Sequence, residues 1–251
     1  MSEDKPNVTP SAHPRTDFAD TLTLLDRPAS AMGYRMPAEW EPLDALWVTP
    51  PHNEETWPGC LDKAQAQFDA FTAAASRYVT VRTTQSLGIA TNDSWIRDYG
   101  PIFVVRTDRA EPDAAALACH DFHFDGWGGK YEVRDSDDVV PQHVARALNI
   151  PLWIHDITLE GGSIEVNGRG TVMTTRQCLL NENRNAHLSQ QQIEAYLHAA
   201  LGTRHIIWLP GGIEGDDTDG HIDDVARFID ARTVVAVLPP QGHPDRPVLE
   251  G

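Results

Sequence analysis

The sequence predicts an α/β protein, because short apolar strands alternate with amphipathic helices along most of the 251 residues. Strand pairs separated by single helices recur about three times, without a residue-level repeat at a fixed period. A hydrophobic content of 41% and a charged content of 23% are ordinary for a globular protein. We therefore expect a flexible N-terminal arm over residues 1–30 and a domain of mixed strands and helices over residues 31–251.

The N-terminal part of the chain begins without periodicity. Residues 1–30 are polar and proline-bearing, which predicts a flexible or loosely docked arm. Strands are then predicted at Leu46–Val48 and Tyr78–Val81, with a helix between them near residues 60–76. A further strand is predicted over Ile102–Val105.

The central part contains a helix and a hairpin. Residues 137–148 carry an apolar stripe at helical spacing, with Pro141 in the first turn, where proline is tolerated. Residues 163–175 read as a hairpin that turns at Asn167-Gly168, a dipeptide that accepts the positive φ angles of a tight turn.

The C-terminal part repeats this order. Ser189 begins a helix in which Gln192 completes a capping box, and Gly202 ends it. A strand is predicted over His205–Leu209, and another hairpin over Ala226–Leu238.

Charge and cysteine usage exclude several classes of function. The net charge of −17 argues against a nucleic-acid partner and favours a cationic or neutral one. No apolar run reaches membrane-spanning length, and the first residues lack a signal sequence. The three cysteines, Cys60, Cys119 and Cys178, have no Cys-x-x-Cys spacing, so we expect reduced thiols in the cytoplasm.

The segment Gly215–Asp224 gathers five carboxylates around His221. If the segment is extended, His221 and Asp223 project from one face and can share a substrate. An EF-hand register would place Gly215 at position 1 and Ala226 at position 12, where acids are needed, and zinc-ligand spacing is absent. We therefore expect no metal here, and a solvated acidic loop is an equally good reading of this segment alone.

A second segment, Asn92–Pro101, mixes an aromatic residue, two acids and a base. Trp95 and Asp98 can together hold a flat cation, by stacking and by charge-assisted hydrogen bonds. In the alternative, which we favour for the segment alone, Arg97 pairs with Asp93 or Asp98 while Trp95 packs in the core.

Two glycine-bearing segments complete the set of motifs. Glu160 precedes Gly161-Gly162, where a ligand or another backbone can approach closely. The segment Trp127–Lys130 is a loop or part of a pocket wall, and it lacks the spacing of a phosphate-binding loop.

Together these segments resemble the agmatine deiminase family, which belongs with peptidyl-arginine deiminases among the guanidino-group-modifying enzymes. The resemblance extends from about residue 33 to about residue 240, in the family's order. The matching segments are Met36–Pro42, Pro51–Gly59, Asn92–Pro101, Trp127–Tyr131, Leu159–Ser163, Cys178–Asn185 and Trp208–Asp223. The family fold is an α/β propeller with pseudo-fivefold symmetry, so the resemblance implies that residues 31–251 form a partial propeller.

The resemblance also implies roles for the motif residues. Asp98 and Asp223 would pair with the guanidinium of the substrate, and His221 would be the general acid/base. Glu160 would support His221 or line the pocket. Trp95 and Trp127 would lie beside the substrate. By the same resemblance, Asp217 would face the amine end of agmatine, and no cofactor is required.

The family mechanism needs a cysteine thiolate that forms an amidino-enzyme intermediate, and in relatives it lies close to the C-terminus. The chain stops at Gly251 before such a motif, and Cys178 falls in a family segment expected away from the active site. The reaction of the family is the conversion of agmatine to N-carbamoylputrescine and ammonia, in putrescine (polyamine) biosynthesis. We expect this chain to be truncated and marginally folded, and not to catalyse that reaction.

Other functions stay open at this point. A bacterial-type peptidyl-arginine deiminase shares the core residues, although the absence of a signal sequence and the presence of Asp217 favour the small amine. A non-catalytic module that binds a guanidinium or polyamine would keep the carboxylates without the thiol. A metal-dependent hydrolase has little support from ligand spacing. A homo-oligomer is possible, but no interface can be read from the sequence.

Overall fold

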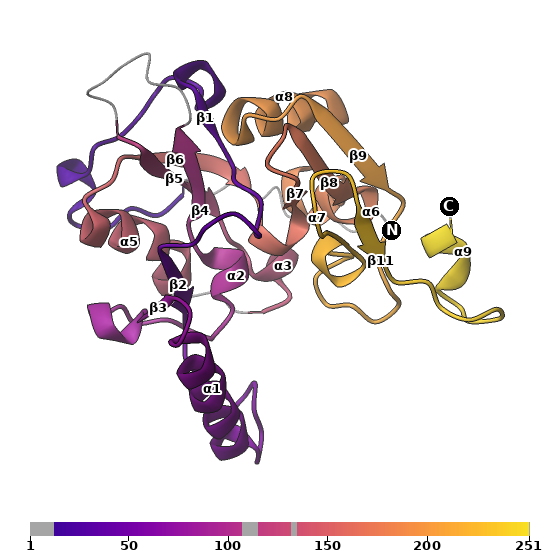
Figure 1. Cartoon of the computed structure of the whole chain (residues 1–251), viewed down its shortest axis with the longest axis horizontal. Helices are drawn as coiled ribbons and strands as arrows, with labels where there is room; N and C mark the ends of the chain where they lie inside the picture. The colour runs from indigo at the N-terminus through magenta and orange to yellow at the C-terminus, as the bar shows by residue number, and fades with distance from the viewer. Residues whose placement is uncertain (1–12, 107–114, 132–134, 251) are drawn as a thin grey trace, which may run out of the picture.

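The computed structural model describes residues 13–106, 115–131 and 135–250 (Figure 1). Within them, the strands form a four-stranded sheet, a three-stranded sheet and two separate pairs. The predicted α/β class is therefore confirmed. In the described part of the chain, no helix is both long and apolar enough to cross a membrane.

The larger sheet has the order β1-β4-β5-β6. Its strands are β1 (Tyr34–Arg35), β4 (Ile102–Arg106), β5 (Leu117–His123) and β6 (Leu152–Thr158). β4 and β5 form an antiparallel pair, and the helix α5 (Val140–Leu148) connects β5 to β6, which lies parallel to it. A hairpin followed by a helical crossover is thus the unit of this sheet.

The second sheet repeats the same unit. Its strands are β7 (Glu165–Val166), β8 (Thr171–Thr175) and β9 (His205–Leu209). β7 and β8 are antiparallel, and α8 (Gln190–Leu201) leads to β9, which is parallel to β8. The predicted capping box of Ser189 and Gln192 is present, and Gly202 ends α8 with φ 65°, in the left-handed region.

Two strand pairs and several short helices complete the fold. The parallel pair is β2 (Ala45–Val48) and β3 (Thr80–Thr83), joined by α1 (Leu61–Ala75), which projects from the rest of the molecule in Figure 1. The antiparallel pair is β10 (Ala226–Phe228) and β11 (Val234–Ala236). The remaining α-helices are α2 (Ile96–Tyr99), α3 (Gly126–Gly129), α4 (Asp135–Asp138), α6 (Arg176–Leu179), α7 (Glu182–Asn185) and α9 (Arg246–Glu250).

The predicted helix over residues 137–148 is divided. α4 ends at Asp138, and α5 begins at Val140. Pro141 lies in the first turn of α5, where its missing N–H costs no helical hydrogen bond. The division places the Asp138 side chain beside the end of β5, where its Oδ1 accepts a hydrogen bond from Phe124 N–H.

The described part of the N-terminal arm packs against the larger sheet. Residues 1–12 lie outside the described residues, so flexibility there stays a prediction. Further along, Leu25 N–H donates to Leu152 O, and Leu152 N–H donates to Thr23 O, so the arm runs alongside β6. Ala19 and Ala29 are buried. Residues 13–30 are therefore docked, because β6 offers them an unpaired edge.

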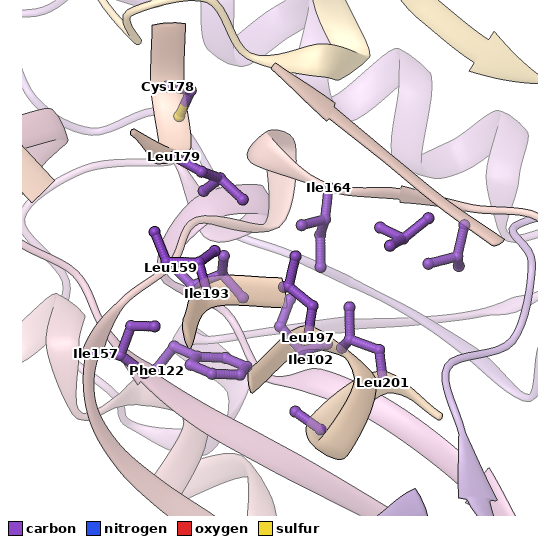
Figure 2. Close-up of a cluster of buried hydrophobic side chains, with 13 residues drawn as sticks. Ile102, Phe122, Ile157, Leu159, Ile164, Cys178, Leu179, Ile193, Leu197 and Leu201 are labelled. Carbon is purple, nitrogen blue, oxygen red and sulfur yellow. The ribbon is translucent and has the colours of Figure 1, made fainter. Parts of the chain in front are cut away.

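The main core joins the two sheets. It includes Ile102 and Phe122 from the larger sheet, Ile164 beside the smaller one, and Leu197 and Leu201 from α8 (Figure 2). Because these side chains exclude water together, the core fixes the two sheets relative to each other. Loops that lead out of both sheets can then hold side chains in a constant arrangement.

Apolar side chains stay exposed at the β10-β11 pair and on α1. Val235 is 55% exposed on β11, and Leu238 is 57% exposed just beyond it. On α1 no residue is buried, and Phe71 is 52% exposed. Both places therefore have apolar surface available for further packing.

Candidate active site

Three predicted site residues from distant parts of the chain meet above one glycine. Asp98 lies on α2, while His221 and Asp223 come from the turn that contains the 3-10 helix η5 (Ile222–Asp224). A Cβ atom placed on Gly162 would lie 2.4 Å from His221 Nδ1, 2.8 Å from Asp98 Oδ1 and 3.1 Å from Asp223 Oδ1. The three side chains therefore converge only because position 162 has no side chain.

The local geometry of His221 and Asp223 differs from the prediction. The condition considered for this segment, an extended strand in which alternation places both side chains on one face, is not met, since Ile222–Asp224 forms a 3-10 turn. Tight turns within Gly215–Asp224 replace the strand. Asp216 accepts hydrogen bonds from Thr218 N–H and Gly220 N–H, which holds the turn in shape. This turn brings the side chains of His221 and Asp223 together beside Gly162.

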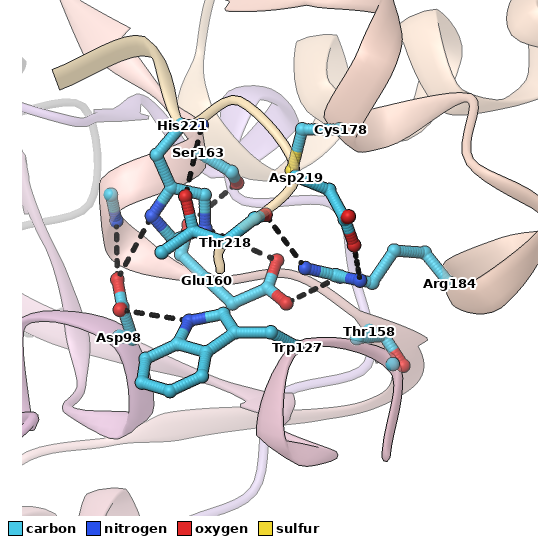
Figure 3. Close-up of polar contacts among 12 residues, drawn as sticks. Asp98, Trp127, Thr158, Glu160, Ser163, Cys178, Arg184, Thr218, Asp219 and His221 are labelled. Carbon is cyan, nitrogen blue, oxygen red and sulfur yellow. Dashed lines mark hydrogen bonds and ion pairs between the residues drawn. The ribbon is translucent and has the colours of Figure 1, made fainter. Parts of the chain in front are cut away.

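Asp98 is held by two donors in a buried position (Figure 3). Its Oδ1 accepts Gly162 N–H at 2.9 Å, and its Oδ2 accepts the indole N–H of Trp127 at 3.1 Å. His221 Nδ1 lies 3.6 Å from Oδ1. Burial raises the pKa of Asp98 to about 6, although these two hydrogen bonds oppose the rise.

Glu160 is joined to a residue that the motif analysis did not single out, Arg184. Arg184 Nε donates to Glu160 Oε1 at 2.6 Å, and Arg184 Nη1 lies 3.1 Å from Asp219 Oδ2 (Figure 3). Glu160 Oε2 is 4.0 Å from His221 Nε2, and neither atom has a hydrogen-bond partner among the described residues. Burial raises the pKa of Glu160 to about 7 against the effect of Arg184.

His221 is a neutral imidazole at neutral pH. Burial lowers its pKa to about 4, although Asp223 and Asp216 act in the opposite direction. A neutral ring can accept a proton, and its Nε2 faces the unpartnered oxygen of Glu160. The arrangement therefore suits proton transfer between a histidine and a carboxylate.

Arg97 orients Asp223. Its Nε donates to Asp223 Oδ2 at 3.2 Å, and its Nη1 donates to Glu39. The alternative in which Arg97 pairs with Asp93 or Asp98 is therefore wrong. Burial raises the pKa of Asp223, and the positive charge of Arg97 opposes that shift.

An aromatic cleft of about 930 Å³ lies next to this cluster. Trp95, Trp127 and Tyr131 line it, with ring centroids 4.6 Å apart for the two tryptophans and 5.2 Å apart for Trp127 and Tyr131. Asp217 lies at the rim and accepts the hydroxyl of Tyr131 at 2.8 Å. Trp127 contributes both to the cleft wall and to the hydrogen bond with Asp98.

The cleft and the carboxylate cluster are separate in this conformation. The cleft is lined by acidic side chains, among them Glu54, Glu55 and Asp93, whereas Asp98 and His221 are buried and do not line it. Trp127, which lines the cleft and donates its indole N–H to Asp98, is the residue that the two regions share.

Cys178 is closer to the site than the sequence indicated. Its Sγ lies within 4.8 Å of a ligand atom of Glu160 and of His221, so the expectation that it lies away from the site is wrong. The reason is that Thr175, which ends β8 and caps α6, donates its hydroxyl hydrogen to Gly220 O and so holds the start of α6 against the Gly220–His221 turn. Cys178 is completely buried, and burial raises the pKa of its thiol well above the ordinary value.

Cys119 and Cys60 occupy other positions. Cys119 is completely buried in β5, and burial raises the pKa of its thiol as well. Cys60 immediately precedes α1 and is half-buried.

Comparison with known proteins identifies relatives of the chain. The family model described as Porphyromonas-type peptidyl-arginine deiminase matches residues 35–250. The chain is 41% identical over 221 residues to agmatine deiminase of Medicago truncatula, a match that covers 78% of this chain and 59% of that protein. It is 37% identical over 222 residues to agmatine deiminase of Pseudomonas aeruginosa, covering 79% and 59%. The chain thus spans about three fifths of the length of these curated relatives.

Solved structures agree with this similarity. The structure of agmatine deiminase of Enterococcus faecalis catalysing its reaction matches with a TM-score of 0.83 and 30% identity, covering 91% of this chain and 67% of that one. A substrate-bound agmatine deiminase of C. jejuni matches with a TM-score of 0.76 and 32% identity, covering 86% and 68%.

Proposed function

We propose that this chain, which belongs to the Porphyromonas-type peptidyl-arginine deiminase family, supplies the guanidinium-binding part of an agmatine deiminase. The observation that carries the proposal is the convergence of Asp98, Asp223 and His221 above Gly162. A guanidinium is protonated at every physiological pH and offers planar N–H groups, which two carboxylates can accept together.

The proposed reaction is hydrolysis of agmatine to N-carbamoylputrescine and ammonia, a step in polyamine synthesis. Asp98 and Asp223 would hold the guanidinium, and His221 would transfer protons to the departing ammonia and from the incoming water. Glu160, whose Oε2 faces His221 Nε2, would keep the imidazole in position. Arg184 would hold Glu160 in turn through the 2.6 Å hydrogen bond.

The substrate preference rests on the cleft. Trp95 and Trp127 offer aromatic faces to a cation, and Asp217 at the rim offers a carboxylate to a second positive charge. Agmatine carries an amine at the end opposite its guanidinium, whereas an arginine inside a peptide does not. The Asp217 carboxylate therefore favours agmatine over peptidyl-arginine as the substrate.

We further propose that the chain alone does not turn over agmatine. The nucleophile of such a reaction is a thiolate. The thiols of Cys119 and Cys178 are buried and have raised pKa values, so both are held in the neutral form. Cys60 is not among the residues that line the aromatic cleft.

The fold of the whole protein is proposed to be an α/β propeller with pseudo-fivefold symmetry, of which residues 31–251 form part and residues 1–30 an arm. The support is the unit repeated in β4-β5-α5-β6 and β7-β8-α8-β9, in which an antiparallel hairpin is followed by a helical crossover to a parallel strand. The exposed apolar strand β11 is where a further unit would pack.

Calorimetric titration with agmatine tests the binding proposal. Putrescine is the matched ligand, because it has the same four-carbon chain with an amine in place of the guanidinium. We expect agmatine to bind at least about tenfold more tightly than putrescine, and Asp98→Asn to remove that preference, since hydrogen bonds to charged groups contribute about 1.5–3 kcal/mol. Asp69→Asn on the exposed face of α1 is the control. Equal affinity for the two ligands would contradict the proposal.

Ammonia release tests the proposal about turnover. We expect none from agmatine with the chain alone. Release of ammonia would show that one of Cys60, Cys119 and Cys178 acts as the nucleophile, and the Cys→Ala variant of each would identify it.

A further inference from the structure

A second cluster of ionisable side chains lies where the N-terminal arm crosses the end of β5. It contains His13 from the arm, Asp121 and His123 from β5, and Asp138 at the end of α4. His13 Nε2 is 3.2 Å from Asp121 Oδ1 and 3.7 Å from Asp138 Oδ1, and His123 Nδ1 is 2.7 Å from Asp138 Oδ2. One ligand atom each from His13, His123 and Asp138 lie within 4.8 Å of one another.

Two atoms of this cluster face each other in the interior. His13 Nε2 and Asp121 Oδ1 lie 3.2 Å apart but form no well-aligned hydrogen bond with each other or with another described residue, although the two side chains are 1% and 0% exposed. Buried polar atoms normally have well-aligned partners, because the lack of one costs roughly 1–3 kcal/mol. A cation that accepts an electron pair from each of the two atoms would satisfy both.

The other atoms of these side chains are held by the surrounding structure. His13 Nδ1 lies 2.9 Å from Pro14 O, which directs the lone pair of the neutral ring to Nε2. Asp121 Oδ2 accepts Gln142 Nε2–H at 2.9 Å, and Asp138 Oδ1 accepts Phe124 N–H. Metal-binding histidines and carboxylates are typically oriented by such outer contacts.

We propose that His13, His123 and Asp138, together with Asp121, form a binding site for a divalent transition-metal cation of the zinc class. Two imidazole nitrogens and two carboxylate oxygens are a ligand set that zinc accepts in tetrahedral geometry. The cation would replace the hydrogen bond between His123 and Asp138 and neutralise both carboxylates. It would join three separate segments of chain, the arm, β5 and α4.

The cation would act on the structure without taking part in the proposed deiminase chemistry. Its ligands differ from Asp98, Glu160, His221 and Asp223, and it would fasten the arm to the end of β5 through His13. β5 continues through Phe124 into α3, which carries Trp127, so the same site anchors the strand end from which the cleft wall departs. In the absence of metal, a protonated His13 would form ion pairs with the two carboxylates.

Calorimetric titration of the chelator-treated chain with Zn²⁺ tests this site, with elemental analysis of the dialysed product. We expect one Zn²⁺ per chain. His13→Ala and Asp138→Asn should each weaken binding at least about 100-fold, the upper end of the loss seen when an outer contact of a metal ligand is removed. His143→Ala is the matched control, because His143 contacts Phe18 of the arm but is not a ligand. Absence of stoichiometric binding by the unmodified chain would overturn the proposal.

Two further measurements separate this site from others on the chain. Trypsin cleavage after the exposed Arg15 should be slowed by Zn²⁺ in the unmodified chain and unaffected by Zn²⁺ in His13→Ala. Substitution with Co²⁺ should give a spectrum without thiolate-to-metal charge transfer. A thiolate band would place the metal at Glu160, Cys178 and His221 instead, and would overturn the proposal, as would full retention of binding in His13→Ala.

Discussion

Arg184 Nε lies 2.6 Å from Glu160 Oε1, and both side chains are completely buried. The pair connects α7 to the loop after β6, and Glu160 Oε2 lies 4.0 Å from His221 Nε2. Because an unpaired charge in such a place is expensive, the pair is a sensitive point of the fold as well as of the site.

Arg184→Met should therefore destabilise the chain. Removing one partner of a buried ion pair leaves the other charge unpaired, which costs about 3–5 kcal/mol. The free energy of unfolding in urea measures the loss, with Arg232→Met on the exposed surface as the control. A loss no larger than that of the control would show that the pair contributes little.

Gly162→Ala should abolish agmatine binding. The added Cβ would meet His221 Nδ1 at 2.4 Å, so the histidine, Asp98 or the loop must move. Titration with agmatine checks the loss of affinity. Gly242→Ala is the control, since its Cβ meets nothing within 4 Å and only the positive φ of 86° is strained. Unchanged affinity in Gly162→Ala would exclude this place as the guanidinium site.

Agmatine affinity should fall as the pH is lowered through about 6. The guanidinium stays charged, whereas Asp98, with a pKa of about 6, takes up a proton and stops pairing with it. Below pH 6, the affinity should fall by about tenfold per pH unit. Above pH 7, Asp98 is ionised and should contribute no further pH dependence to the affinity. Asp98→Asn should remove this part of the dependence. Titrations between pH 5 and 8 test it, and an affinity that rises with acidity would contradict the assignment.

Native alkylation should modify Cys60 well before the other two cysteines. Cys119 and Cys178 are buried and their thiols have raised pKa values, so the reactive thiolate is scarce and inaccessible in both. Mass spectrometry of peptides after iodoacetamide treatment at pH 7 gives the order. Urea should make all three react. Rapid labelling of Cys178 without urea would instead make it a candidate nucleophile beside His221.

The elements with local signals were predictable from the sequence. The capping box of Ser189 and Gln192 involves neighbouring residues only, and so does the turn at Asn167-Gly168, where Gly168 has φ 64°. The division between α4 and α5 was missed, because the side chain of Asp138, the last residue of α4, accepts a hydrogen bond from Phe124 N–H, which is a contact across the fold.

The site was predictable in its residues but not in its arrangement. Asp98, Glu160, His221 and Asp223 were identified through motifs and resemblance, and their roles stay predictions. Arg184 was not singled out, because its partner Glu160 is distant in sequence. Trp127 has φ 59°, which no sequence rule expects of a bulky residue, and Cys178 lies near His221 only because β8 and the Gly220 turn are joined by Thr175.

The core shared by the two sheets has a consequence for folding. In the sequence, Asp98 lies on α2 before β4, Glu160 lies between β6 and β7, and His221 belongs to the last third of the chain. The distances between these residues are therefore established only when both sheets have docked. Closing such long stretches of chain is slow, which makes the site one of the last parts to form. A compound that binds at this site therefore binds only the fully folded chain. Its binding should slow hydrogen exchange at the most protected amides of both sheets together.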